Sequence, residues 1–273
     1  MYRSPYANAA GAARLLIWKA GEYYRVLFSD VACFDVTPDS IVVYPQAGLS
    51  YQLLNTYFLG PAMSFWLEWR GIPTLHASAV VANGHAVAFI SQSRGGKSVL
   101  AASWVQAGHP LLTDDILAVA HDHGTPIGYP GYPQMRLWAD EAQYFLGRSE
   151  GLEYVHPAYL KYRVPIGPAC FGRFCHTPQP MGCLYLVERS EAGASEIKIA
   201  PVAPTLAVVT LARHSFAPHI VEALKLQVQQ LEILTRLVQR VPVRRLVYPS
   251  GFEQLAAVRE AILNDLAELR VVG

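Results

Sequence analysis

The chain has few of the residues that mark specialised classes of protein. Its 273 residues include only four cysteines, and its formal net charge is +1. Four irregularly spaced cysteines do not make a disulfide scaffold, which favours a reducing, cytoplasmic location. A net charge near zero gives no global reason to expect nucleic acid or an anionic membrane as a partner. Internal repeats and low-complexity segments are also missing.

Long hydrophobic segments are missing as well. The most apolar stretch runs from Leu53 to Trp69 and is interrupted by Gly60, Pro61 and Glu68. A helix needs roughly 20 apolar residues to span a bilayer, so we expect no membrane span. We predict a buried helix broken near Gly60 and Pro61, with a monotopic membrane contact as the alternative. The N-terminal segment has no sustained apolar region, so we expect no signal peptide.

The composition instead fits a compact α/β protein. Hydrophobic residues make up 52% of the chain and charged residues 16%, which is enough to bury a sizeable core. Alternating and β-branched runs within residues 1–70 predict a small β-rich N-terminal piece that also carries the buried helix. We expect this piece to recognise a substrate or partner. Residues 71–273 are predicted to form one larger domain.

One stretch combines a strand, a small polar turn and a helix. Residues 86–90 form a short apolar run typical of a buried strand, and residues 99–106 have helical apolar spacing. The residues between them include SQSRGGKS, which matches the phosphate-loop pattern GxxxxGK[ST] except at its first position. A serine can replace that first glycine only if its φ stays negative, and Gly95 and Gly96 remain available for the tight approach.

The loop has the chemistry that nucleotide phosphates require. Backbone N–H groups and the helix N-terminus can cradle the phosphates, and Lys97 can reach the β and γ oxygens as a catalytic cation. The Ser98 hydroxyl can ligate Mg²⁺, so we predict ATP and Mg²⁺ as ligands. The predicted nucleotide-binding residues are Ser91, Gln92, Ser93, Arg94, Gly95, Gly96, Lys97, Ser98 and Val99.

Two adjacent carboxylates follow the next apolar segment. Residues 109–112 lead into Thr113, Asp114 and Asp115. If this segment is a parallel neighbour of the strand before the loop, both carboxylates lie beside the loop. One can then accept a hydroxyl proton while the other holds the metal. The alternative is that one aspartate only caps the segment that follows.

These segments resemble the HPr kinase/phosphorylase-like kinases, which share their nucleotide fold with ATP-dependent phosphoenolpyruvate carboxykinases. The resembling pieces are LHASAV at 75–80, SQSRGGKS at 91–98 and LLTDD at 111–115. His76 lies 15 residues before Ser91, and Asp114 lies 16 after Ser98, as in that family. The segment GYPQMRLW at 131–138 looks like one in smaller relatives encoded beside lasso-peptide genes, which are regarded as kinases of the precursor peptide.

The resemblance implies a P-loop core with a small N-terminal β-rich piece, and a role for each site residue. Asp114 matches the catalytic aspartate that accepts the hydroxyl proton, and Asp115 with Ser98 would hold Mg²⁺. His76 would bond Asp114 or the γ-phosphate, unless it is a structural histidine. Arg136 would stabilise the transferring phosphoryl group, unless it is a surface arginine.

Further candidates are weaker. Lys161, Arg163 and Arg213 are additional cations in segments that resemble the smaller kinases, and Asp140 could be a second acidic metal ligand. The signature stretch that houses the corresponding glutamate in HPr kinases is absent, which argues against the reverse, phosphorylase reaction. A zinc site built from Cys170, Cys175, His176 and Cys183 lacks a C-x2-C knuckle, so we predict buried cysteines there. The segment HDHG at 121–124 is predicted to be a hairpin turn rather than a metal site.

The remaining pattern predicts how the fold closes. Residues 183–187 and 197–199 are expected to form paired strands. A helical pattern runs from Pro218 to Pro242, and a strand at 245–248 and a helix at 254–269 follow it.

Together these observations predict an ATP-dependent kinase that transfers the γ-phosphoryl group to a hydroxyl. The leading acceptor is a serine of a peptide or small protein, as in a lasso-peptide precursor. The alternatives are a kinase of a free amino acid or sugar, and a non-catalytic nucleotide-binding regulator, because Ser91 and Arg94 depart from the usual loop. The acceptor, the phosphate donor and the oligomeric state, including a homo-oligomer, stay open.

Overall fold

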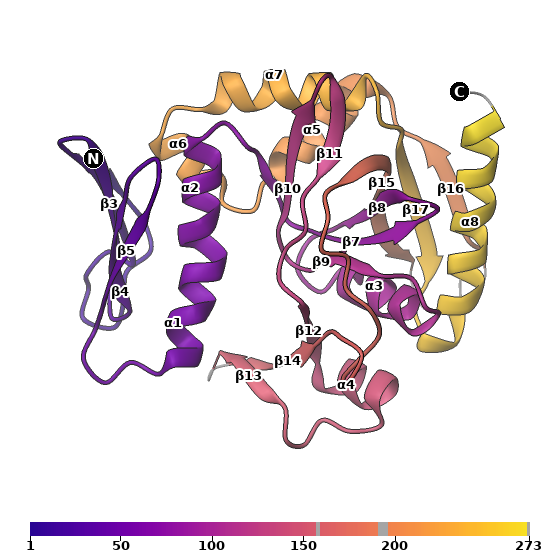
Figure 1. Cartoon of the computed structure of the whole chain (residues 1–273), viewed down its shortest axis with the longest axis horizontal. Helices are drawn as coiled ribbons and strands as arrows, with labels where there is room; N and C mark the ends of the chain where they lie inside the picture. The colour runs from indigo at the N-terminus through magenta and orange to yellow at the C-terminus, as the bar shows by residue number, and fades with distance from the viewer. Residues whose placement is uncertain (157–158, 191–195, 272–273) are drawn as a thin grey trace.

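The computed structural model describes residues 1–156, 159–190 and 196–271. Within these residues the chain is a mixed α/β protein with three β-sheets (Figure 1). The N-terminal sheet and the last helix lie at opposite ends of the long axis, with the largest sheet between them. No helix among the described residues combines the length and apolar character needed to cross a membrane.

The largest sheet is built around β8 (His85–Ile90), whose last five residues are buried. β8 pairs antiparallel with β7 (Ala77–Ala82) and parallel with β15 (Gln179–Ser190). The remaining strands of this sheet are β6 (Thr74–Leu75), β9 (Leu111–Thr113), β10 (Leu117–Asp122), β11 (Thr125–Gly128), β16 (Lys198–Pro201) and β17 (Val243–Pro249).

The strand order at the phosphate loop differs from the predicted one. β9 is not a neighbour of β8, because β7 lies between them and runs antiparallel to both. β8 and β9 therefore point the same way, and the segments that follow them meet at one edge of the sheet. The first residues of β7 lie between those two ends. This arrangement keeps the acidic pair beside the loop and adds His76 and Ser78 between them.

The C-terminal half shows two further differences. The strands predicted to pair, β15 and β16, are separated by β17, which is parallel to β15 and antiparallel to β16. The helical pattern predicted from Pro218 is split into two helices, and the preceding helix was not predicted. The helices of this half are α5 (Pro204–Arg213), α6 (Pro218–Ala223), α7 (Gln227–Val238), the 3-10 turn η2 (Phe252–Gln254) and α8 (Leu255–Val271).

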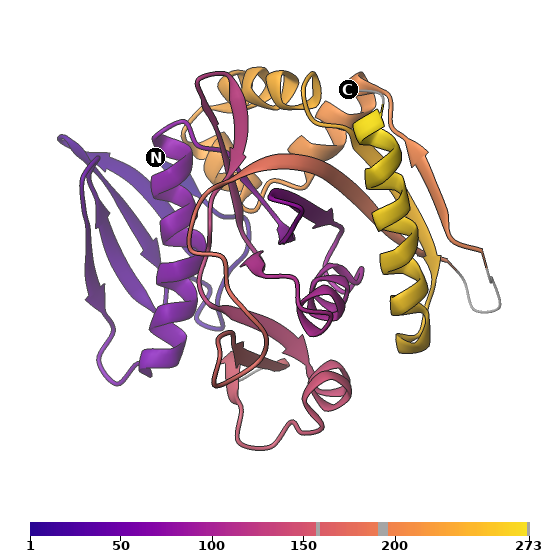
Figure 2. The ribbon, with the colours of Figure 1, turned by 45° about the vertical axis from the view of Figure 1, so that its right-hand side comes forward.

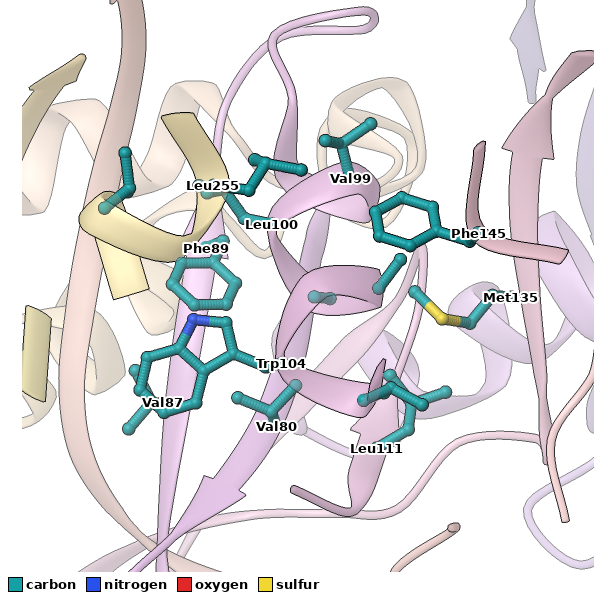
Figure 3. Close-up of a cluster of buried hydrophobic side chains, with 14 of the residues drawn as sticks. Val80, Val87, Phe89, Val99, Leu100, Trp104, Leu111, Met135, Phe145 and Leu255 are labelled. Carbon is teal, nitrogen blue, oxygen red and sulfur yellow. The ribbon is translucent and has the colours of Figure 1, made fainter. Parts of the chain in front are cut away.

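The main core lies between the sheet and helix α3 (Lys97–Gln106). Phe89, Leu100 and Trp104 are fully buried there, and the rings of Phe89 and Trp104 lie 6.1 Å apart. Figure 3 shows these side chains packed together with Leu255, which begins α8. Because α3 is apolar on nearly every face, the surrounding core packs against nearly every face of it. The N-terminus of α3, where the phosphate loop ends, is therefore fixed in position.

The N-terminal residues form an antiparallel five-stranded sheet, as the β-rich pattern predicted. Its core also takes up Ala217 and Ile220 from around α6, so it packs on the C-terminal half of the chain. The division into residues 1–70 and 71–273 stays a prediction. The strands of this sheet are β1 (Tyr2–Arg3), β2 (Leu15–Ala20), β3 (Tyr23–Phe28), β4 (Ala32–Val36) and β5 (Ile41–Pro45).

A long helix stands between the N-terminal sheet and the largest sheet in both views (Figures 1 and 2). It runs from α1 (Tyr51–Tyr57) through a π-helical turn, η1 (Phe58–Ala62), into α2 (Met63–Trp69). The predicted break at Gly60 and Pro61 is wrong, because the wider π turn accommodates the proline without ending the helix. The helix is also only partly buried, since α1 has no fully buried residue.

The third sheet carries the segment 131–138 to the site. Arg163 and Thr56 tie this sheet to α1: the Arg163 guanidinium donates to Thr56 Oγ1 at 2.5 Å, and that hydroxyl lies 2.8 Å from the Val155 carbonyl. Arg163 therefore anchors a helix through its hydrogen bond to Thr56 and lies opposite Arg136 in the register of β12 and β14. The elements here are β12 (Gln134–Trp138), α4 (Ala139–Leu146), β13 (Glu153–His156) and β14 (Tyr159–Pro165).

Candidate active site

The phosphate loop has the conformation that its unusual first residue requires. Ser91 keeps a negative φ and is 4% exposed. A Cβ at Gly95 would lie 2.5 Å from Ser91 Oγ, so a serine at 91 needs a glycine at 95. Arg94 adopts the left-handed region at φ 65°, which costs a non-glycine residue energy and is often found at functional sites.

Gly96 brings two side chains against the loop that the sequence did not single out. It has φ 96°, and a Cβ there would lie 2.5 Å from the Tyr248 hydroxyl and 2.8 Å from Arg189 Nε. Arg189 and Tyr248 come from the C-terminal ends of β15 and β17, which run parallel to β8. Their position at the ends of predicted strands is a signal that could have identified them. Arg189 adds a cation beside the loop.

Lys97 is the first residue of α3 and is 6% exposed. Its ammonium donates to the Gln92 carbonyl at 3.4 Å, so the side chain curls over the loop. Burial lowers the pKa of Lys97, although Asp114 nearby favours the charged form. A buried ammonium with few protein partners is well suited to a ligand that brings negative charge.

Asp114 accepts hydrogen bonds from three donors on three segments. Ser98 Oγ lies 2.9 Å from Asp114 Oδ1, and Ser78 Oγ lies 2.5 Å from the same atom. The backbone N–H of Arg136 donates to Asp114 Oδ2 at 2.7 Å. Three segments therefore converge on the Asp114 carboxylate: the loop through Ser98, the start of β7 through Ser78, and β12 through the backbone of Arg136.

Asp115 is held in an ion pair. Arg136 Nη1 lies 2.5 Å from Asp115 Oδ2, and His76 Nε2 lies 3.4 Å from Oδ1. Burial opposes ionisation, but Arg136 and His76 outweigh it and keep the pKa of Asp115 well below its usual range. The backbone of Asp115 is left-handed at φ 81°, another strained position at this site. His76 contacts Asp115 rather than Asp114.

The segment that supplies Arg136 can approach the acidic pair because Gly131 has no side chain. The Gly131 N–H donates to the Leu112 carbonyl at 2.9 Å, and a Cβ at this glycine would lie 2.2 Å from Thr113 Oγ1. Because the chain can pass this close to Thr113, β12 begins next to the acidic pair, and Arg136 on β12 contacts both aspartates.

Other cations line a cavity of about 500 Å³ beside the loop. The Arg94 guanidinium lies 4.5 Å from the Trp138 ring centroid, and Lys161 Nζ lies 5.7 Å from it. Thr56, Ser93, Arg136 and His156 also line this cavity. The third sheet thus brings Lys161 to this cavity, whereas Arg213 is exposed at the end of α5.

The weaker candidates have different outcomes. Asp140 lines a neighbouring cavity with Glu141 and Arg189, and its role as a metal ligand stays a prediction. The prediction of buried cysteines holds for Cys183, but Cys170 is exposed and Cys175 is only half-buried. The described residues contain no group of three or more metal-ligating side chains. The hairpin at 121–124 is confirmed, because β10 and β11 pair across it.

These features together fit a nucleotide and a divalent cation. Any side chain larger than that of glycine would collide with neighbouring atoms at positions 95 and 96 of the loop. The Lys97 ammonium is buried within the loop. At the N-terminus of α3, the Ser98 hydroxyl donates to the Asp114 carboxylate. Anionic phosphates match the first two features, and Mg²⁺, which prefers hard oxygen ligands, matches the third.

No family model and no curated protein matches the chain. Among solved structures, it is similar to the HPr(Ser) kinase/phosphatase from Coxiella burnetii at 12% identity and a TM-score of 0.35. The match covers 73% of this chain and 99% of that one. A likeness of this strength does not show a common family, so the site itself must carry any proposal about function.

Proposed function

We propose that this chain is an ATP-dependent kinase that transfers the γ-phosphoryl group to a hydroxyl. The observation that carries the proposal is the convergence of Ser98, Asp114, Asp115 and Arg136 at the mouth of the phosphate loop. Phosphoryl transfer depends mainly on positioning and on electrostatic stabilisation, and this cluster supplies groups for both.

The binding of ATP rests on the loop and its cations. Backbone N–H groups of the loop and the N-terminus of α3 would hold the phosphates, and Lys97 would contact the β and γ oxygens. Arg136 and Lys161 would face the transferring group. When bound, Mg²⁺ would neutralise charge on the β and γ oxygens, with Ser98 and one aspartate as its ligands.

The chemical step needs one base. The acceptor oxygen forms a bond to the γ phosphorus, its proton passes to Asp114, and the bond from that phosphorus to the bridging oxygen of ADP breaks. Asp115 would then be the metal ligand. Its ion pair with Arg136 keeps it ionised, which makes it the poorer base of the two.

One contact favours the opposite assignment of the two aspartates. Ser98, the proposed metal ligand of the loop, donates to Asp114 and not to Asp115. In that assignment Asp114 holds the metal with Ser98, and Asp115, with its partner His76, faces the acceptor. Paired asparagine variants separate the two assignments, as set out below.

The acceptor class is a finer proposal. The resemblance of the loop and of segment 131–138 to peptide kinases supports a serine of a peptide or small protein, including a lasso-peptide precursor. A free amino acid or a sugar is the alternative acceptor. A regulator that binds nucleotide without transfer is the alternative function, since Ser91 and Arg94 depart from the usual loop.

Transfer of label from γ-labelled ATP to serine peptides, free serine and sugars tests the proposal. We expect label on one acceptor class, dependence on Mg²⁺ or Mn²⁺, and no dependence on zinc. Nucleotide binding without transfer to any class would favour the regulator. Stoichiometric zinc whose removal abolishes transfer would mean that the cysteine cluster was misjudged.

A further inference from the structure

A second cavity adjoins the acidic pair and differs in character from the cationic one. It has a volume of about 390 Å³ and lies between the long helix and the strands that follow the acidic pair. Its wall is mostly apolar. The wall includes Met63, Trp66 and Leu67 from α2, Ala118 from β10, and Ile116 and Tyr129, which lie just before β10 and just after β11.

The polar groups of this cavity are concentrated near the acidic pair. Asp114, Asp115 and Arg136 line it together with Gln134, and Arg70 lies elsewhere on the wall. The Arg70 guanidinium is already engaged, because it donates to the Pro38 carbonyl at 2.5 Å and lies 4.7 Å from the Trp66 ring. A ligand in the cavity would therefore meet apolar groups along its body and carboxylates at one end.

Arg136 lines both cavities and marks the boundary between them. On one side lie Arg94 and Lys161, which attract phosphates; on the other lie the two carboxylates, which repel them. A phosphate donor belongs on the cationic side for this reason. The apolar side is left for a neutral group that presents a hydroxyl to the aspartates.

We propose that the apolar cavity is the acceptor site and selects a hydroxyl flanked by a bulky apolar group, such as a serine next to leucine or phenylalanine in a peptide. This inference rests on the proposed kinase activity. A sugar fits the cavity poorly, because most of its hydroxyls would lose hydrogen bonds against apolar walls. Free serine would leave most of the volume unfilled, whereas cavities of this size suit a small peptide segment.

The helical wall of the cavity is preformed. Thr74, which begins β6, donates its N–H to Glu68 at 2.7 Å, and the hydroxyls of Thr74 and Ser64 lie 2.7 Å apart. All three side chains are buried. Since α2 is pinned to the largest sheet in this way, the cavity should bind an apolar group without first ordering its wall.

Two peptides separate the acceptor site from the kinase activity. The first is acetyl-Gly-Leu-Ser-Phe-Gly-amide and the second has alanine in place of leucine and phenylalanine. With the wild-type protein and γ-labelled ATP, we expect kcat/KM to be about tenfold to a hundredfold higher for the first peptide, as burial of one or two large apolar side chains implies. The analogue of the first peptide with alanine at serine should change the tryptophan fluorescence of the wild-type protein, because Trp66 lines the cavity.

Cavity-filling variants locate the effect. Met63→Trp and Ala118→Leu should each lower kcat/KM for the apolar peptide about tenfold or more, while the affinity for ADP stays unchanged. Val228→Trp is the matched control, because Val228 is 71% exposed on α7, away from the cavity. Met63→Ala, which enlarges the cavity, guards against a filling variant that fails to fold.

The outcomes are distinguishable. Equal transfer to both peptides, or filling variants that behave as the control does, would overturn the acceptor site while leaving the kinase intact. ADP binding without transfer to any acceptor would overturn the proposed function, and the acceptor site with it. Preference for the apolar peptide that is lost only in the cavity variants supports both.

Discussion

The two cavities on either side of Arg136 share the long helix as a wall but differ in the side chains that face it. The cationic cavity takes only Ser93 and Arg94 from the loop, and the third sheet supplies Trp138 and Lys161. The apolar cavity is completed by residues 113–136, which bring apolar side chains and the two carboxylates. Both cavities therefore depend on how distant segments pack, and the charge of their walls is what separates them.

The strongest test of this division is the pair of aspartates next to Arg136, the residue that lines both cavities. Asp114→Asn keeps the shape of the side chain but removes the base. A positioned base contributes about 10²- to 10⁴-fold in rate, so we expect kcat to fall by that order while ATP binding changes little. Asp115→Asn should weaken Mg²⁺-dependent nucleotide binding as well. Label transfer and calorimetric titration with ADP, with and without Mg²⁺, measure the two effects.

The exchanged assignment predicts the opposite pattern. If Asp114 holds the metal with Ser98, Asp114→Asn loses the Mg²⁺ dependence of ADP binding and Asp115→Asn loses only turnover. Transfer at the wild-type rate by both variants would contradict either assignment. The base would then have to be His76 or a group of the acceptor.

On the cationic side, Lys97→Ala removes the buried ammonium of the loop. Because its contacts to phosphate would be charge-assisted, loss of the ammonium should cost roughly 2 kcal/mol or more, which lowers ATP affinity or kcat/KM about thirtyfold. Lys198→Ala is the matched control, because Lys198 is exposed on β16 and pairs with Glu196 at the surface. Equal ATP affinity and turnover in the two variants would contradict the phosphate-loop assignment.

On the apolar side, Glu68 should make the stability of the protein depend on pH. Glu68 is 3% exposed, and burial raises its pKa from 4.5 to about 7, despite hydrogen bonds from Thr74 that favour the ionised form. Between these two values the folded protein keeps a proton that the unfolded chain releases. Stability should therefore fall as pH rises from about 4.5 to about 7, and Glu68→Gln should remove this part of the fall.

Urea unfolding of both proteins at pH 5 and pH 8 measures the effect. The difference between wild type and Glu68→Gln isolates Glu68 from the partly buried histidines, whose pKa values are lowered mainly by burial. We expect that difference to change by on the order of 1–3 kcal/mol between the two pH values. Parallel pH profiles for the two proteins would show that Glu68 is ionised in the folded state.

The smallest expected effect concerns Trp138, whose ring is in contact with both Arg94 and Lys161 on the cationic side. Trp138→Leu keeps an apolar group but removes the ring. Each cation–π contact is worth about 0.5–1 kcal/mol at exposed sites, so KM for ATP should rise a few fold while KM for the acceptor stays unchanged. A rise in the acceptor KM alone would place Trp138 on the wrong side of Arg136.

Sequence patterns predicted best where the relevant residues are close together in the chain. Residues 86–106 were predicted as strand, loop and helix, and the structure has β8, the loop and α3 there. The need for a negative φ at position 91 was also predictable, because it concerns one residue and its own backbone. Asp114 and Asp115 lie beside the loop, as expected, but the strand order behind that expectation is wrong, because β7 lies between β8 and β9.

Errors arose where longer-range packing decides. Pro61 predicts a break when the helix is considered alone, but the chain widens into a π turn and continues. Two apolar runs near each other in sequence predict a pair of strands, but β17 from far along the chain lies between them. Local propensity is a weak guide in both cases because tertiary contacts contribute more energy.

The sequence by itself determined the strand, the loop of residues 91–98 and the helix that follows it, since the glycines, lysine and serine of the loop act through backbone conformation and side chains within a few residues of one another. Only the tertiary structure decided that Ser98 meets Asp114, that Asp115 pairs with Arg136 and His76, and that Arg189 and Tyr248 close on the loop. It also decided that an apolar cavity opens beside the carboxylates. These contacts join residues far apart in the chain, and they exist only because burial of the core fixes the strand order that brings them to one edge of the sheet.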